Sequence, residues 1–186
     1  SKGIAAKGKT VRAVMINSGN ANACTGAQGD KNARAMAEIT AKQLKVKKNE
    51  VLVCSTGRIG VQLPWEKLMY VIKTTAASLS NTKVGDDANA IITTDLVKKE
   101  CAASFKTDDG KTVTIASMTK GSGMIAPQMK TVPLHATMLS FITTDALIDK
   151  AFLHKTFDNC VRATFNKITV DGDMSTNDTV SILANS

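Results

Sequence analysis

Four short loops rich in Gly, Asn, Ser and Thr constrain the fold most, because each one follows or ends a predicted strand. They read NSGNANACTG (residues 17–26), CSTGRIG (54–60), KGSGMIAP (120–127) and VDGDMSTND (170–178). Loops at strand ends are where backbone amides and hydroxyls commonly converge on a ligand. Taken singly, each loop is also explained by ordinary turn chemistry. The sequence therefore predicts a scaffold of strands and helices that carries its function in its loops.

The strands are predicted from short apolar or alternating runs. Val11–Ile16 and Val51–Ser55 lead into the first two loops, and Met138–Ile142 is a third run. Cys101–Lys106 and Thr112–Met118 flank the sequence DDG, which predicts a β-hairpin with a glycine in its turn.

Apolar residues at helical spacing predict three helices. They are Asp30–Lys45, a segment opened by Pro64, and Asp149–Phe165. Asp30 is the predicted N-cap of the first helix. Ser175 and Asp178 have the capping-box spacing that predicts one more helix at the end of the chain. The mixture of strands, hairpin and helices predicts an α/β domain with a layered α+β architecture.

The net charge of +8 raises nucleic acid as a partner, but the residue pattern argues against it. The basic residues are scattered, and one Tyr and one Trp cannot form a row of stacking platforms. A mild positive field instead suits small anions such as amino-acid carboxylates. No apolar run is long enough for a transmembrane helix, so no membrane association is predicted. The N-terminus, SKGIAAKGKT, lacks an initiator Met and predicts a chain that starts within a longer protein.

The cysteines and histidines exclude several kinds of site. They are Cys24, Cys54, Cys101, Cys160, His135 and His154. No CxxC pair is present, so the sequence predicts neither a zinc site nor a disulfide scaffold, and the thiols are expected to be reduced and mostly buried. Two histidines make a Ser-His-Asp triad a poor candidate. The loop VDGDMSTND lacks the central Gly and the closing Glu of a calcium loop.

One nucleophile would need no histidine. Thr137 stands between Ala136 and a predicted strand, where it is either an ordinary strand residue or the first residue of a chain cut at that point. An N-terminal threonine carries its own base, because a free α-amine has a pKa of roughly 7.7–8.0 and can take the hydroxyl proton.

Six motifs, in order along the chain, resemble the ornithine acetyltransferase (glutamate N-acetyltransferase, ArgJ) family. They are NSGNANACTG, STGRIGVQLP, AIITTD, KGSGMIAP, ATMLSFITTDA and FNKITVDGDMSTNDTV. The resemblance implies an ArgJ/DmpA-like fold and a precursor that cleaves itself at Ala136–Thr137, with Thr137 as the autoprocessed N-terminal nucleophile. Residues 1–136 would be an α-chain-like region and 137–186 the start of a β-chain-like region, together one domain that is truncated relative to the family. The implied assembly is an α2β2 heterotetramer in the cytoplasm, or in the mitochondrial matrix of a eukaryote.

The resemblance also implies roles for individual residues. Thr56 and Gly57 of STGRIG would form the oxyanion hole. Lys120 of KGSGMIAP would bind substrate, as would Thr93 or Thr94 of AIITTD, of which Thr93 is preferred. Thr137 would accept the acetyl group of N2-acetylornithine and pass it to glutamate, through an acetyl-threonine ester. Some family members also use acetyl-CoA as a donor, and no metal ion or organic cofactor is implied.

Two other readings stay open. An N-terminal-threonine aminopeptidase or amidohydrolase would use the same nucleophile and give the acyl group to water. An uncleaved, inactive fragment is the non-enzymatic alternative. It is favoured by the extra residues KTVPLH between Pro127 and Ala136, which look like an insertion relative to the family, and by the short chain.

Overall fold

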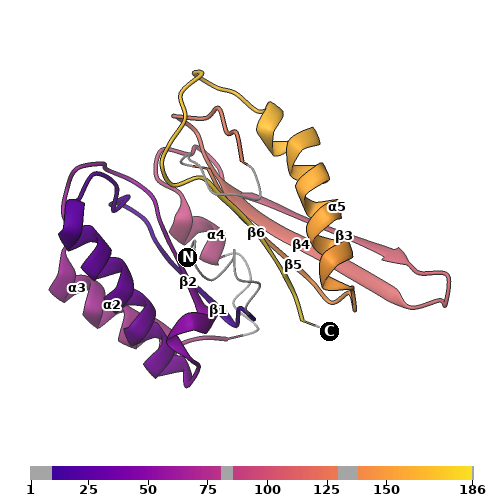
Figure 1. The fold of residues 1–186 in the computed structure, drawn as a ribbon, viewed down its shortest axis with the longest axis horizontal. Helices are drawn as coiled ribbons and strands as arrows, with labels where there is room; N and C mark the ends of the chain where they lie inside the picture. The colour runs from indigo at the N-terminus through magenta and orange to yellow at the C-terminus, as the bar shows by residue number, and fades with distance from the viewer. Residues whose placement is uncertain (1–9, 81–85, 130–137, 186) are drawn as a thin grey trace. The chain divides into compact units, whose positions relative to one another are not determined.

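The computed structural model describes residues 10–80, 86–129 and 138–185 (Figure 1). The chain divides into two compact units, Ser1–Asp86 and Asp87–Ser186, each of which has its own hydrophobic core. The predicted boundary at Ala136–Thr137 falls within the second unit and outside the described residues, so it stays a prediction.

The first unit packs two helices against a parallel pair of strands. Strand β1 (Ala13–Asn17) pairs with β2 (Val51–Ser55), and a parallel pair needs a crossover, which α2 (Gly26–Leu44) provides. Helix α3 (Trp65–Ala77) lies beside α2 (Figure 1), and the 3₁₀ turn η1 (Lys48–Glu50) leads into β2. The buried apolar side chains are those of Met36, Ala37, Ala41, Val51, Leu63 and Ile72.

The predicted start of α2 at Asp30 is wrong, because the helix begins four residues earlier. The Thr25 carbonyl accepts the N–H of Gly29 at 3.2 Å, which is the first hydrogen bond of the helix. Gly26 and Gly29 have low helix propensity, so the first turn resembles a loop in the sequence. A side chain at position 29 would collide with the Thr25 hydroxyl, which lies 2.0 Å from the place of a Cβ, and this explains the glycine there.

The second unit is a four-stranded sheet with one long helix. The order is β3 (Lys99–Lys106), β4 (Thr112–Lys120), β5 (Leu139–Thr144) and β6 (Thr179–Ala184), in which only β5 and β6 are parallel. Helix α5 (Lys150–Ala163) connects β5 to β6, and the short α4 (Asp86–Ile91) and the 3₁₀ turn η2 (Phe165–Lys167) complete the elements. Side chains of α5 and of the segments around β5 form the core, among them Val161, Met138, Ile125 and Met129.

Most predicted elements are confirmed within two residues, and the hairpin and the segment Val51–Ser55 form as predicted. The predicted last helix is wrong, because residues 179–184 form β6. Asp178 accepts the backbone N–H of Met138 and so caps no helix, while Val180 and Ile182 have the β-branched side chains that suit a strand paired with β5. The mixture of helices and sheets confirms the predicted α/β class.

The prediction that the cysteines are mostly buried is wrong. No disulfide joins the four cysteines, but only Cys54 is buried, whereas Cys24, Cys101 and Cys160 are exposed. Their reduced state stays a prediction.

Candidate functional site

In the first unit, the two predicted loops that follow β1 and β2 run beside each other. The Thr56 N–H donates to the Asn17 carbonyl at 3.0 Å, and the Arg58 N–H donates to the Gly19 carbonyl at 3.1 Å. Asn20 and Arg58 form an isolated parallel bridge that extends the strand pairing. The loops NSGNANACTG and CSTGRIG therefore form one structure, with Thr56 fully buried in it.

Polar side chains at the strand ends join these loops further. The Ser55 hydroxyl donates to the Asn17 side-chain oxygen at 2.6 Å, and the Asn17 amide donates to the Asn20 carbonyl at 2.9 Å. The Thr56 N–H donates to the Asn17 carbonyl, so it is already engaged within the paired loops.

Gly57 lies at a close approach of the two loops. Its φ is +125°, and a Cβ there would lie 2.3 Å from the Gly19 carbonyl carbon and 2.5 Å from its oxygen. Only glycine fits both the backbone conformation and the space.

Replacing Gly57 by alanine is expected to destabilise the first unit by roughly 1–3 kcal/mol more than replacing Gly60, because it forces two backbones apart. Gly60 is the matched control, since it also has a positive φ but no atom within 4 Å of a Cβ. Urea unfolding followed by the fluorescence of Trp65, the single tryptophan, measures both variants. Equal losses in the two would contradict the close approach.

In the second unit, Lys120 ends β4 and is only 2% exposed. Its ammonium donates to the hydroxyl of Thr93 at 3.1 Å and lies 3.9 Å from the carboxylate of Asp95. Thr93 is itself exposed, as is Thr94. A buried cation is therefore in contact with an exposed threonine and a buried carboxylate.

Asp95, which the sequence analysis did not single out, organises this cluster. Its Oδ1 atom accepts the N–H of Gly121 at 2.8 Å and the ammonium of Lys99 at 2.5 Å. Burial favours a higher pKa for Asp95, but the Lys99 ammonium, the Gly121 N–H and the Lys120 charge together hold that pKa below its ordinary value. Asp95 is thus an ionised anchor for the start of the KGSGMIAP loop.

The Lys120 side chain, like that of Asp95, is almost completely removed from solvent. Burial lowers the pKa of its ammonium, and the positive charge of Lys99 lowers it further, while the charges of Asp95 and Asp178 act in the opposite direction. A desolvated ammonium with these neighbours interacts strongly with any anion that reaches it.

Two more aspartates tie the KGSGMIAP loop and the start of β5 to the last loop of the chain. The carboxylate of Asp171 accepts the N–H of Met124 at 2.6 Å and that of Ile125 at 2.9 Å. Asp178 accepts the N–H of Met138. Both aspartates lie in the motif FNKITVDGDMSTNDTV. Their acidic side chains in a loop that contains a glycine were the only sequence signal that they accept backbone N–H groups.

The predicted site residues fall into three groups. Thr56 and Gly57 lie together in the first unit, and Thr93 and Lys120 are in contact in the second, where Thr94 follows Thr93 in the same exposed segment. Ala136 and Thr137 lie outside the described residues.

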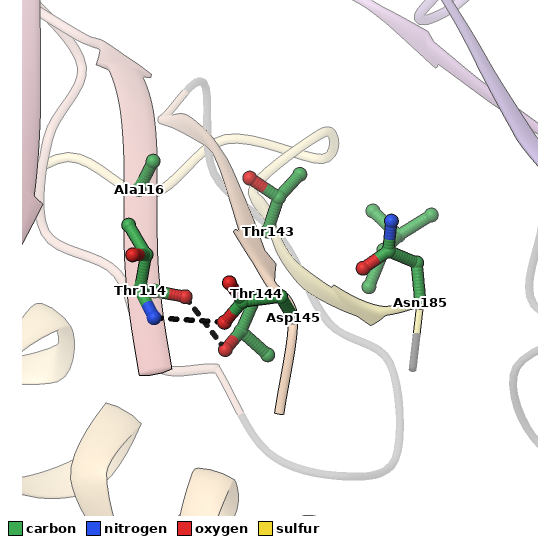
Figure 2. Close-up of a pocket in the computed structure, with 7 residues that line it drawn as sticks. Thr114, Ala116, Thr143, Thr144, Asp145 and Asn185 are labelled. Atoms are coloured by element: carbon green, nitrogen blue, oxygen red, sulfur yellow. Dashed lines mark hydrogen bonds between the residues drawn. The ribbon is translucent and has the colours of Figure 1, made fainter. Parts of the chain in front are cut away.

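A shallow groove of about 430 Å³ lies at the opposite end of β5 from Lys120, between the strand ends (Figure 2). Thr114 donates its N–H to Asp145 there at 2.7 Å, and the Thr144 hydroxyl donates to the Thr114 carbonyl at 2.9 Å (Figure 2). None of the predicted site residues lines this groove, so it is not the candidate site.

Within residues 10–80, 86–129 and 138–185, no three His, Cys, Asp or Glu side chains group closely enough to hold a metal ion. No helix in the described part of the chain has the length and apolar character needed to cross a bilayer.

Comparison with known proteins gives a consistent result. The ArgJ family model matches residues 1–186. The arginine biosynthesis bifunctional protein ArgJ of Caldanaerobacter subterraneus subsp. tengcongensis is 51% identical over 181 residues, which is 97% of this chain and 43% of that protein. ArgJ of Thermotoga neapolitana is 51% identical over 175 residues, covering 94% of this chain and 42% of that protein. The chain thus spans less than half the length of these relatives.

Solved structures agree with the sequence comparison. Ornithine acetyltransferase from Mycobacterium tuberculosis, crystallised in complex with ornithine, has a TM-score of 0.61 at 40% sequence identity and covers 68% of this chain and 66% of that one. The crystal structure of ArgJ from Bacillus halodurans has a TM-score of 0.57 at 37% identity, over 62% of this chain and 60% of that one.

Proposed function

This chain belongs to the ArgJ family, and from that membership we propose that it carries out acetyl transfer from N2-acetylornithine to glutamate in arginine biosynthesis. The single observation that carries the proposal is the buried Lys120, whose ammonium is held by Thr93 and Asp95 in the second unit. The ornithine bound to a relative that is 40% identical supports an amino-acid substrate.

The proposed reaction has two halves, both of which use Thr137 as the N-terminal nucleophile after self-cleavage at Ala136–Thr137. The Thr137 hydroxyl oxygen attacks the acetyl carbonyl carbon while its own α-amine accepts the hydroxyl proton. The bond between the acetyl carbon and the ornithine nitrogen then breaks, and that proton passes to the leaving amine. In the second half, the glutamate amine attacks the acetyl-threonine ester and restores the free hydroxyl.

Negative charge develops on the carbonyl oxygen in both halves, and Thr56 and Gly57 are proposed to stabilise it. These two residues lie together in the paired loops of the first unit, where the Thr56 N–H donates to the Asn17 carbonyl. One lost donor of this kind typically costs about 3–4 kcal/mol of barrier stabilisation.

Lys120 and Thr93 are proposed to bind the substrate, and the carboxylate of the amino acid is the group that suits the ammonium. The contact between Thr93 and Lys120 supports Thr93 over Thr94 as the binding threonine. The anchoring of Asp95 to Gly121 and Lys99 leaves this part of the site preorganised for an anion.

Replacing Lys120 by alanine is expected to raise KM for N2-acetylornithine by about 10- to 100-fold, because a charge-assisted hydrogen bond contributes about 1.5–3 kcal/mol. Self-cleavage should be largely retained. The matched control is Lys111→Ala, which removes an exposed lysine from the β3–β4 hairpin. An unchanged KM in Lys120→Ala would refute the binding role.

The reaction products test the proposal against its two alternatives. The chain is incubated with N2-acetylornithine in the presence and absence of glutamate, and free ornithine and N-acetylglutamate are measured. Release that depends on glutamate supports the transferase, whereas release without glutamate indicates the hydrolase. A single intact chain by mass spectrometry, with no ornithine released, would support the uncleaved and inactive alternative.

The remaining family expectations are proposals of the same kind. They are an α2β2 assembly of the α-chain-like region 1–136 and the β-chain-like region that starts at 137, acetyl-CoA as an additional donor, and a cytoplasmic location. Size-exclusion chromatography of the cleaved protein tests the assembly.

A further inference from the structure

Residues 178 and 179 hold both backbone hydrogen-bonding groups of Met138. The Met138 N–H donates to Oδ1 of Asp178, and the Met138 carbonyl accepts the N–H of Thr179 at 2.8 Å. The Met138 side chain is buried in the core beside Ile125 and Val161. Met138 is therefore fixed through its backbone and its side chain at once.

The second carboxylate oxygen of Asp178 sets this residue apart from an ordinary loop aspartate. Oδ2 is buried and has no hydrogen-bond partner among the described residues. Burial raises the pKa of Asp178 to about 7, although the Met138 N–H and the charge of Lys120 both lower it. A buried carboxyl that is incompletely satisfied is costly to keep, and such groups concentrate at functional sites.

We propose that Asp178 is a positioning residue for the acyl transfer, which acts by fixing Met138. The Met138 nitrogen is bonded to the carbonyl carbon of residue 137, so Asp178 holds the chain at the first peptide bond after the nucleophile. This inference rests on the proposed function, because it gives Asp178 a role only if Thr137 reacts.

The role follows from the precision that a nucleophile requires. A reacting group must be held to within about 0.5 Å, and a misplacement of about 1 Å can cost 10²-fold in rate. A residue at the start of a chain has covalent support on one side only, so hydrogen bonds to the next residue determine its position. Asp178 provides such a bond from a residue 40 positions away in the sequence.

Three variants test this role. Asp178→Ala removes the acceptor, Asp178→Asn retains an oxygen that can accept the Met138 N–H, and Asp173→Ala is the control, an exposed carboxylate in the same loop. Two properties are measured: hydrogen exchange of the Met138 amide in ¹⁵N-methionine-labelled protein, and self-cleavage together with kcat and KM for N2-acetylornithine.

We expect Asp178→Ala to accelerate exchange at Met138 and to reduce cleavage and kcat by about 100-fold, with KM within about twofold of the wild type. Asp178→Asn should restore slow exchange at Met138 and most of the cleavage and kcat. Asp173→Ala should change neither the exchange nor the activity. In the wild type, the Met138 amide shift should titrate near pH 7, a transition absent from Asp178→Asn. Within the described residues, the charge that acts on the Asp178 carboxyl is that of Lys120, and Asp95 and Lys99 act in turn on Lys120.

The outcomes separate this inference from the proposed function. Normal cleavage and kcat in Asp178→Ala would overturn the positioning role alone, and so would unchanged exchange at Met138. A wild-type chain with neither cleavage nor transfer would overturn the proposed function and the positioning role with it. In that case the exchange data would still report whether Asp178 holds Met138 as a purely structural contact.

Discussion

Replacing Thr137 by alanine is expected to leave the chain uncut and to reduce acetyl transfer by at least about 10³-fold, because no other group supplies the attacking oxygen. Alanine removes the hydroxyl, and in the uncut chain the nitrogen of residue 137 stays in a peptide bond, so the variant lacks both the nucleophile and its base. Mass spectrometry reports cleavage at Ala136–Thr137, and formation of N-acetylglutamate reports transfer.

Two further variants make the Thr137 result specific. Thr137→Ser keeps a hydroxyl and should retain measurable cleavage and transfer. Thr143→Ala removes an exposed threonine hydroxyl from β5 and should behave as the wild type. Two chains separated at residue 137 in Thr137→Ala would refute the assignment of the nucleophile.

Replacing Asp95 by alanine is expected to lower the free energy of unfolding of the second unit by roughly 3 kcal/mol, because it leaves the buried Lys120 ammonium without its nearest carboxylate. The Gly121 N–H and the Lys99 ammonium lose their acceptor as well. Hydrogen exchange of the β4 and β5 amides measures this loss within the unit itself.

A control variant and a rescue variant test whether the stability lost in Asp95→Ala comes from the unpaired charge of Lys120. Asp109→Ala removes an exposed carboxylate that pairs with Lys111, and it should leave exchange unchanged. Adding Lys120→Met to Asp95→Ala should recover part of the loss, because it removes the uncompensated charge. A double variant no more stable than Asp95→Ala alone would contradict this explanation.

The interactions of Asp95 also make the stability of the second unit depend on pH. The folded-state pKa of Asp95 is below its ordinary value of 3.8. Its contribution to stability is therefore complete above that ordinary value and is lost as the pH falls through the lowered pKa. The difference in stability between the wild type and Asp95→Ala should accordingly shrink only in strong acid.

The sequence predicted the parts of the fold that depend on local patterns. The run VLVCS gave the bounds of β2 because five apolar or small residues lie between a 3₁₀ turn and a polar loop. The final strand was mistaken for a helix because the capping-box spacing of Ser175 and Asp178 is a local pattern, whereas the partner of Asp178 is Met138, 40 residues away. Pairing with β5 decides that segment, and no local pattern reports it.

The candidate site was predictable to the same degree. The motif resemblance identified Lys120 and Thr93, which the structure finds in contact. It did not identify Asp95 or Asp178, because each accepts a backbone N–H, a group that every residue except proline carries. Asp95 also pairs with the side chains of Lys99 and Lys120. Such contacts leave no mark at the donor position in a single sequence.

The hydrogen bonds that residues 178 and 179 make to Met138 have a consequence for when the proposed self-cleavage can occur during synthesis. Asp178 and the β6 strand that follows it are made after residue 137, so the ribosome must release more than forty further residues before these hydrogen bonds can form. A nascent chain that ends before Asp178 would carry the threonine without the support that we assign to it. Cutting of the precursor would then wait for translation to pass that aspartate, which would protect the growing polypeptide from being severed too early.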